Sequence, residues 1–343
     1  CFMRPILRLL GAGSNTYEYA RQYALSVIVA GGVPTVLSNV LSNLLRSVGR
    51  STAAGFGIVL GGVLNIALDP LFMFVLLPDG QEVLGAGVAT CISNCIACLY
   101  FIVVLLAGGK GQVITFNPKV GLAERESIEA IFAVGVPSAV TNFLFDLDYV
   151  ILDRLMVSYH DLALAAIGIV LKVERFPLNI GVGICQGMMP LVGYNYAAGY
   201  RKRMRDSIRL SLGVGLVIAA ISIALYEIFA SQLIRLFLDD AQTVELASAF
   251  LRVRVLATPL MFISFFTVYL FQAFGKGTVS LLLGVVRWLV FNIPMLYLLN
   301  TIFGMYGLVW SQVTADTLSV IMSLTVYIKF RPPILRKDQL PER

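Results

Sequence analysis

The residues of this sequence most suited to chemistry are acidic side chains inside long apolar stretches. The stretch 128–156 contains Asp146, Asp148 and Asp153, and Tyr149 shares a helical face with Asp146 and Asp153 whereas Asp148 points elsewhere. A carboxylate at the middle of a membrane costs several kcal/mol unless it is paired or hydrated. Because such a group can bind and release Na⁺ or H⁺, these three aspartates are candidates for cation coupling.

The next apolar stretch, 162–194, brings more charges toward the predicted membrane centre. Lys172 and Glu174 lie about 10 to 12 residues beyond the outer loop, which corresponds to roughly 15–18 Å of helix. Glu174 is the fourth candidate for cation coupling. Lys172, Arg175 and Asn179 follow one stripe of the predicted helix and are candidates for lining a cavity.

Polar residues of other apolar stretches complete the candidate site. Asn39 and Asn43 belong to a stripe with Thr35 and Arg46, which either lines a wet cavity or hydrogen-bonds a neighbouring helix. Together, the predicted cavity-lining residues are Asn39, Asn43, Tyr149, Lys172, Arg175, Asn179, Arg287 and Asp316.

A structural role is the alternative for these charges. In that interpretation Lys172 or Arg175 pairs with an aspartate of the preceding helix and holds the two helices together. Arg252 and Arg254 are weaker candidates, because they lie about eight to ten residues from a loop and can extend toward water. The residues alone leave the functional and the structural interpretation open.

The composition indicates an integral membrane protein. Only 13% of the 343 residues are Asp, Glu, Lys or Arg, against roughly 25% in soluble domains. The hydrophobic share is 58% and the mean hydropathy is +0.84. These values exclude a soluble domain, a disordered tail and a disulfide-rich secreted module.

Nine stretches are long and apolar enough to cross a bilayer as helices, which needs about 20 residues each. They are 20–45, 52–77, 84–106, 128–156, 162–194, 207–237, 245–272, 279–300 and 305–328. Every second connecting loop is basic, which predicts that these loops and the C-terminus face the cytoplasm. We therefore expect a multi-pass protein of the cell membrane.

The sequence offers no sign of an enzyme, a metal centre or a nucleic-acid interface. It lacks the common hydrolase, metalloprotease and nucleotide-binding motifs. The single histidine, His160, cannot support a multi-histidine metal site, so no cofactor and no metal beyond a transported Na⁺ is expected. Cys91, Cys95 and Cys98 share one face of an apolar helix and are interpreted as small buried hydrophobic side chains.

An internal repeat relates two parts of the chain. Residues 41–69 resemble 267–295 with an offset of 226, which aligns Gly49 with Gly275. Parallel repeats are typical of secondary transporters built from two similar bundles. The same offset places the start of the first bundle about 100 residues before Cys1. We therefore expect an incomplete first bundle.

Several motifs resemble those of the multidrug and toxic compound extrusion (MATE) family. The first part of the chain contains YALSVIVAGGVPTVLSNVLSNLLRSVGR, NIALDPLF and LGAGVATCIS. The second part contains GVPSAV at 135–140, AAIGIVLKV at 165–173 and, most specifically, QGMMPLVGYNYAAGYRKR at 186–203. The resemblance covers nearly the whole chain.

The resemblance implies an all-α membrane protein with two pseudo-symmetric six-helix lobes, of which the first is incomplete here. The implied domains are a partial N-terminal lobe (1–108), a cytoplasmic linker (109–125), a C-terminal lobe (126–330) and a cytoplasmic tail (331–343).

The implied function is a secondary antiporter, expected as a monomer, that exports cationic or amphipathic compounds in exchange for Na⁺ or H⁺. Many relatives have an acidic residue soon after the Gly-x-Pro of this region, and Asp146 lies close to that position, with Asp148 as its rival. A lipid-linked oligosaccharide flippase of the same superfamily is the alternative. It would need a cationic cavity for pyrophosphate.

Overall fold

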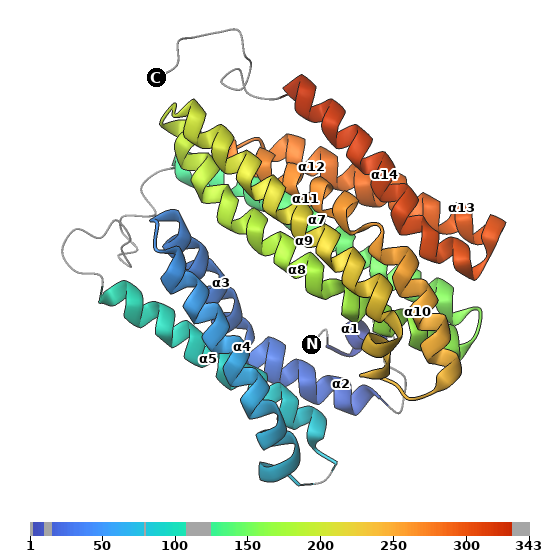
Figure 1. Ribbon diagram of the computed structural model, residues 1–343. Helices are drawn as coiled ribbons and strands as arrows, with labels where there is room; N and C mark the ends of the chain where they lie inside the picture. Colours follow the sequence, from blue (N-terminus) through green and yellow to red (C-terminus); the bar gives the residue numbers. More distant parts are fainter. Residues whose placement is uncertain (1–2, 10–15, 79, 108–124, 331–343) are drawn as a thin grey trace. The chain divides into compact units, whose positions relative to one another are not determined.

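The computed structural model describes residues 3–9, 16–78, 80–107 and 125–330, and the regular structure of these residues is entirely helical. The protein is thus an all-α membrane protein, as predicted. The chain divides into two compact units, Cys1–Gly121 and Leu122–Arg343, which we call unit 1 and unit 2 (Figure 1). Each unit is described by itself.

Unit 1 contains four long helical segments preceded by a short helix. Its elements are α1 (Met3–Leu9), α2 (Tyr17–Ala24), the π-helical η1 (Leu25–Ala30), α3 (Gly32–Ser47), α4 (Ser51–Leu71), the π-helical η2 (Phe72–Leu76) and α5 (Glu82–Leu106). Helix α5 packs against α3 and α4.

Unit 2 contains longer helices, three of which exceed 30 residues. Its elements are α7 (Arg125–Val157), α8 (Asp161–Ala197), α9 (Arg201–Arg235), α10 (Ala241–Val255), α11 (Thr258–Ala273), α12 (Gly277–Val285), the π-helical η3 (Val286–Asn292), α13 (Ile293–Phe303) and α14 (Met305–Phe330). Helix α8 contacts α9, α10 and α11, and α14 contacts α11 and α13 (Figure 1).

A helix, straight or bent, occupies each of the nine predicted stretches. Among the described residues, six helices are long and apolar enough to cross a membrane, and up to eight if each of two bent pairs forms one span. The remaining long helix, α8, carries the charged group Lys172, Glu174 and Arg175. A helix therefore lies at each of the nine predicted crossings, and up to eight of them meet the requirements for a membrane span.

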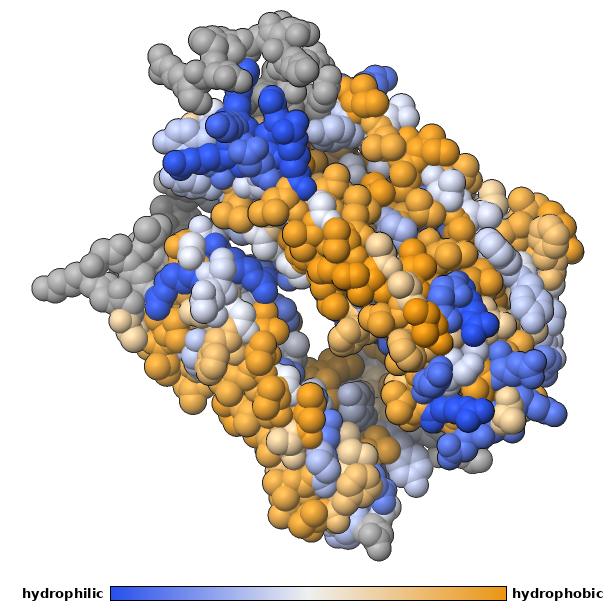
Figure 2. Space-filling view, in the orientation of Figure 1, coloured by the Kyte–Doolittle hydropathy of each residue, from blue (hydrophilic) through white to orange (hydrophobic). Residues whose placement is uncertain are grey.

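Apolar side chains cover the outside of the helices. Ile66, Phe74 and Leu236 are each more than 70% exposed. Figure 2 shows hydrophobic residues along the helices, with hydrophilic residues gathered mainly near helix ends. Because soluble proteins rarely expose apolar patches this extensive, the surface fits a lipid environment.

The predicted repeat recurs in the backbone. Gly49 and Gly275, which differ in number by 275 − 49 = 226, both have positive φ values, 81° and 69°. At each glycine the chain leaves a helix through the same pair of hydrogen bonds: the glycine N–H donates three residues back, and the next N–H donates five residues back. Glycine favours this left-handed turn because it has no Cβ.

The basic residues that follow these glycines have equivalent contacts. Arg50 donates to the Val104 carbonyl in the last turn of α5, and Lys276 donates to the Phe330 carbonyl at the end of α14. A cation at a helix C-terminus interacts favourably with the helix dipole and with free carbonyl groups. The repeat therefore preserves both a turn and its electrostatic contact.

The two bent helix pairs also obey the offset. The chain bends by 47° between α2–η1 and α3, near Gly31, and again by 47° between α10 and α11, near Ala257, and 257 − 31 is 226. Pro34 follows the first bend and Pro259 the second. Proline cannot donate a backbone hydrogen bond, so both helices are weakened at equivalent places.

Pro177 interrupts α8 in a way that the structure compensates. A proline at position 177 deprives the Val173 carbonyl of its usual helical donor. The Tyr226 hydroxyl on α9 replaces that donor at 2.9 Å in a buried position. Helix α8 can thus break its hydrogen-bond ladder near Glu174 without leaving a buried carbonyl group unsatisfied.

Close packing of α12 against α7 generates the first testable prediction. A Cβ atom at Gly277 would overlap the Ala133 carbonyl oxygen, which belongs to the backbone of α7. Gly277→Ala should therefore lower the free energy of unfolding by about 1–3 kcal/mol, the usual cost of overpacking. The measurement is the unfolding midpoint of the purified protein in detergent.

Gly213 in α9 is the matched control, because a Cβ there meets no atom within 4 Å. Gly213→Ala should leave stability unchanged or raise it by up to about 1 kcal/mol, since alanine is the better helix former. Equal midpoints for the two variants would contradict the close approach of α7 and α12.

Candidate functional site

The strongest polar contact inside unit 2 joins α8 to α10. Arg254 Nε donates to Glu174 Oε2 at 2.7 Å, and its terminal nitrogen donates to Glu174 Oε1 at 2.8 Å. The side chains are only 2% and 12% exposed. Two parallel charge-assisted hydrogen bonds fix both groups in one geometry. Arg254 is therefore a buried partner of Glu174, and the expectation that it extends toward water is wrong.

Tyr149 of α7 adds a third member to this contact. Its hydroxyl donates to Glu174 Oε1 at 3.3 Å, and the Arg175 guanidinium lies 5.1 Å from the centre of its ring. The predicted alternative, in which Lys172 or Arg175 pairs with an aspartate of the preceding helix, has no such pair among the described residues. Arg175 instead contacts the aromatic face of Tyr149.

A second buried ion pair joins η3 to α14. Arg287 and Asp316 lie 2.8 Å apart and are 3% and 1% exposed. Gln312 donates to the other carboxylate oxygen of Asp316 at 2.6 Å. The Arg287 guanidinium also lies 4.5 Å from the ring centre of Phe265. Both predicted residues, Arg287 and Asp316, are thus brought together.

Asp148 is the third buried carboxylate of unit 2. Asn292 donates to its Oδ2 atom at 2.8 Å. The Oδ1 atom of Asp148 and the Oδ1 atom of Asn292 are buried without a hydrogen-bond partner among the described residues. Buried oxygen atoms are normally satisfied, and each exception calls for an explanation. Two unsatisfied oxygens on hydrogen-bonded neighbours could accept a proton or coordinate a cation.

Charge counting distinguishes Asp148 from the other two carboxylates. The buried cluster consists of three acids and two arginines: Asp148, Glu174, Asp316, Arg254 and Arg287. With every group ionised its charge is 2 − 3 = −1. Among the described residues, Arg254 pairs with Glu174 and Arg287 pairs with Asp316, and no ion pair reaches Asp148. Because an uncompensated buried charge is costly, the cluster becomes neutral on binding one proton or one monovalent cation.

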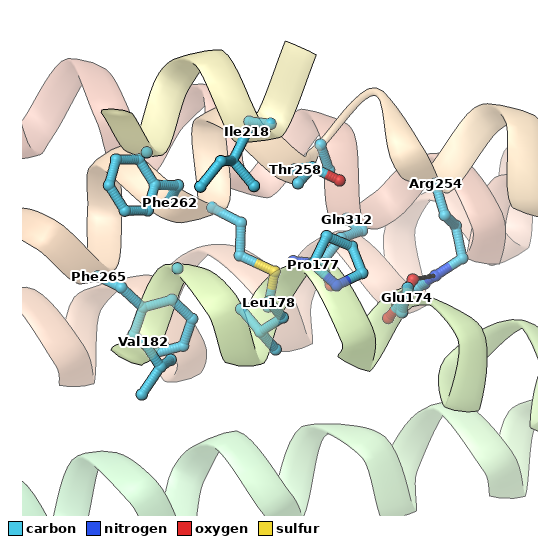
Figure 3. Close-up of a pocket in the computed structure, with 15 residues that line it drawn as sticks. Glu174, Pro177, Leu178, Val182, Ile218, Arg254, Thr258, Phe262, Phe265 and Gln312 are labelled. Atoms are coloured by element: carbon cyan, nitrogen blue, oxygen red, sulfur yellow. Dashed lines mark hydrogen bonds and ion pairs between the residues drawn. The ribbon is translucent and has the colours of Figure 1, made fainter. Parts of the chain in front are cut away.

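A small apolar pocket lies beside the Glu174–Arg254 pair. It has a volume of about 30 Å³, room for about one water molecule. Figure 3 shows Phe262, Phe265 and Val182 on its apolar side, with Glu174 and Arg254 at the other end. Gln312, which donates a hydrogen bond to Asp316, also lines the pocket.

Unit 1 contains a larger hollow of about 160 Å³ between α3, α4 and α5, with polar residues on part of its lining. Thr35 and Asn39 line it from α3, and Asn94 lines it from α5. Asn94 donates to the Thr35 hydroxyl at 2.8 Å, and Asn39 donates to a carbonyl of its own helix. Thr35 and Asn39 of the polar stripe thus line a hollow, and Thr35 also hydrogen-bonds the neighbouring helix α5.

The end of the stripe lies outside this hollow. Asn43 donates to the Asn39 carbonyl at 3.0 Å and accepts a hydrogen bond from Arg46 at 3.0 Å. Asn43 is exposed and does not line the hollow.

Four predicted site residues remain at the surface of unit 2. Asp146 is exposed, although Tyr149, one turn away on the same helix, is buried. The other exposed residues are Lys172, Arg175 and Asn179, and Asp153 is half-buried. The structure therefore gathers Asp148, Tyr149, Glu174, Arg287 and Asp316, and leaves the other unit 2 candidates outside the cluster.

Sequence reasoning missed Asn292, Gln312 and Asp69 and underrated Arg254. Asp69 lies inside the apolar helix α4, where Asn65 donates to it at 3.0 Å and also to Thr90 at 3.3 Å. An acidic residue in an apolar helix is the signal that could have identified Asp69. Neutral amides such as Asn292 give no comparable signal, because only the fold shows which charge they contact.

The described residues contain no group of three or more His, Cys, Asp or Glu side chains placed to hold a metal ion. A permanently bound structural metal therefore has no candidate ligand set there.

Comparison with known proteins supports the family resemblance. The MatE family profile matches residues 137–298. The multidrug export protein MepA of Staphylococcus saprophyticus is 30% identical over 326 residues, which cover 95% of this chain and 70% of the relative. MepA of Staphylococcus aureus is 28% identical over 331 residues, with coverages of 96% and 71%.

Solved structures share the fold. One is an outward-facing multidrug resistance MATE family transporter of the MOP superfamily, with 24% identity, a TM-score of 0.85 and coverages of 94% and 72%. Another is a MOP superfamily transporter from Pyrococcus furiosus, described as having a binding pocket of reversed polarity, with 23% identity, a TM-score of 0.85 and coverages of 97% and 73%.

The buried Glu174–Arg254 pair generates the second prediction. Arg254→Met should lower the free energy of unfolding by about 3–5 kcal/mol, because it leaves the Glu174 carboxylate without its cation. The double variant Arg254→Met/Glu174→Met should recover most of that loss. Unfolding midpoints of the two variants in the same detergent test this difference.

Arg252, two residues away on α10, supplies the control. It lies 3.9 Å from Glu227 in an exposed pair, with side chains 50% and 42% exposed. Arg252→Met should change stability by at most about 1 kcal/mol. Similar losses for Arg252→Met and Arg254→Met would show that the buried pair has no special energetic role.

Proposed function

The chain belongs to the MATE family, and we propose that it exports cationic or amphipathic compounds in exchange for Na⁺ or H⁺ that moves into the cell. It is a membrane transporter rather than an enzyme. Its relatives from Staphylococcus are multidrug export proteins, which supports the substrate class. The proposal concerns the compounds carried, the coupling ion and the residues that bind it.

The main support for this proposal is that the buried cluster of unit 2 has one positive charge fewer than it has carboxylates. Arg254 is occupied by Glu174, and Arg287 is occupied by Asp316. Within the described part of the chain, Asp148 has only the neutral amide of Asn292 as its hydrogen-bond partner. A proton or a sodium ion at Asp148 would complete the charge balance, and its departure would restore the cost of a buried carboxylate.

This energetic difference can drive exchange. A transporter that binds its coupling cation more tightly in one conformation than in the other shifts its population by that difference in affinity. Cation binding at Asp148 would favour the conformation in which the cluster is buried. Cation release would favour a conformation that hydrates the carboxylate. The inward movement of the cation down its gradient would then supply the free energy for outward movement of the drug.

Asp69 is the proposed counterpart in unit 1. Its carboxylate accepts a hydrogen bond only from the neutral Asn65 in the described part of that unit. A half-buried acid inside an apolar helix is a functional candidate by default. We place it second to Asp148, because Asp148 is 3% exposed and has an unsatisfied oxygen.

The flippase alternative fits less well. A cavity for a diphosphate group needs excess positive charge, whereas the buried cluster of unit 2 has three acids and two arginines. The curated relatives are named as exporters. Export of cationic compounds is therefore the function that we propose.

The proposed setting is the cell membrane, with a monomeric transporter and a cytoplasmic C-terminus. The basic loops support this orientation, since short cytoplasmic loops are enriched in Lys and Arg. Arg50 and Lys276 both follow turn glycines on predicted cytoplasmic loops.

Replacement of Asp148 is the third prediction. Asp148→Asn should abolish dye export driven by an imposed Na⁺ or H⁺ gradient, because the neutral amide lacks the negative charge that Na⁺ or H⁺ would neutralise. The variant should keep at least wild-type thermal stability, since it removes a buried unbalanced charge. The measurement is dye movement in liposomes that contain the full chain.

Separate Na⁺ and pH gradients identify the coupling ion in the same assay. Asp239→Asn, which changes an exposed loop residue, is the control and should transport like the wild type. Wild-type coupling in Asp148→Asn would overturn the assignment of the ion site. Loss of coupling in Asp146→Asn alone would return the site to the exposed aspartate. Dye export that ignores both gradients in the wild type would refute antiport itself.

A further inference from the structure

The cysteines of α5 differ from the interpretation made from sequence. All three are free thiols, and Cys98 is buried as expected. Cys95 is instead exposed and Cys91 is half-buried. Two neighbouring thiols on one helical face are therefore accessible to a reagent. Small side chains of a buried core would not be.

The spacing of these two thiols excludes one product and favours another. Residues four apart on a helix have Cβ atoms about 5–6 Å from each other. A disulfide needs a Cβ separation of about 3.5–4.5 Å. A direct sulfur–sulfur bond between Cys91 and Cys95 would therefore distort α5. A single atom inserted between the two sulfurs lengthens the bridge and fits the undistorted helix.

The surroundings of Cys91 and Cys95 limit which kind of atom can bridge the two sulfurs. Harder metal ions need additional ligands, and no group of three or more acidic, histidine or cysteine side chains in the described part of the chain could supply them. Zinc, for example, takes four ligands. A charged adduct would also be costly in an apolar span. The site therefore suits a soft centre that is satisfied by two sulfurs and forms a neutral product.

We propose that Cys91 and Cys95 form a binding site for trivalent organoarsenic compounds that carry one organic substituent. In the reaction, an organoarsenic oxide and two thiols give one arsenic atom bonded to both sulfurs and one molecule of water. Two arsenic–oxygen bonds and two S–H bonds break, while two arsenic–sulfur bonds and two O–H bonds form. Arsenic remains trivalent, so no oxidant or reductant is needed.

The position of the site favours lipophilic arsenicals. Cys91 and Cys95 lie nine and thirteen residues after Glu82, the first residue of α5, or roughly 14 and 20 Å along the helix. This is the central part of a predicted span. An aromatic substituent would help the reagent reach that depth through apolar surroundings. Phenylarsine oxide is therefore the appropriate probe.

The test measures the mass of the intact full chain after treatment with phenylarsine oxide. We expect one adduct that survives washing with excess monothiol and is removed by 2,3-dimercaptopropanol. A second sulfur on the same helix acts at a high effective concentration, so release should be about 100-fold slower than from a single thiol. Cys91→Ser and Cys95→Ser should each lose the washing-resistant adduct.

Two variants serve as matched controls. Cys98→Ser changes the buried thiol one turn further along α5, and Cys185→Ser changes a buried thiol on α8. Both should keep the adduct. An adduct that persists in Cys91→Ser would refute the proposed pair. If Cys98→Ser loses the adduct while Cys91→Ser keeps it, the pair is refuted as well.

Hydrogen exchange gives a second readout that does not depend on folding of the variants. In the wild type the bridge should slow amide exchange over residues 91–95, because it staples one turn of the helix. The buried α8 segment around Cys185 should exchange at an unchanged rate. A washing-resistant adduct without local protection of α5 would contradict the bridged geometry.

Discussion

A buried carboxylate without a cationic partner is stable only when a proton or a metal ion accompanies it, and Asp148 occupies such a position. Its neighbours are two ion pairs that use up both buried arginines of the cluster. No ion pair therefore joins Asp148 to an arginine among the described residues. We propose that one cation completes the charge balance of the three acids and the two arginines, with the amides of Asn292 and Gln312 beside them.

This cluster lies near several interruptions of the helices of unit 2. Glu174 comes three residues before Pro177, and Arg254 comes shortly before the 47° bend between α10 and α11. Arg287 and Asn292 belong to the π-helical η3, directly before Pro294. π-Helical segments are frequent at functional sites. If Asp148 holds a coupling cation, as we propose, its change of charge would act on elements that can bend at little cost.

Sequence patterns predicted the elements of this structure better than their contacts. Hydropathy located the helices, and the repeat with its offset of 226 aligned Gly49 with Gly275, which the structure shows in equivalent left-handed turns. The pairing Glu174–Arg254 joins residues 80 positions apart, and Asp148–Asn292 joins residues 144 apart. No local rule specifies such partners. Asp146 shows the consequence: it matches the expected position in sequence, yet it is exposed whereas Asp148 is buried.

The most direct test of this account is infrared difference spectroscopy of carboxyl groups in the reconstituted protein, recorded while Na⁺ or H⁺ is added. We expect one carboxyl group to change its protonation or its cation coordination, and we expect that signal to vanish in Asp148→Asn but to remain in Asp239→Asn. A carboxyl signal of unchanged size in Asp148→Asn would contradict the claim that Asp148 holds the coupling cation.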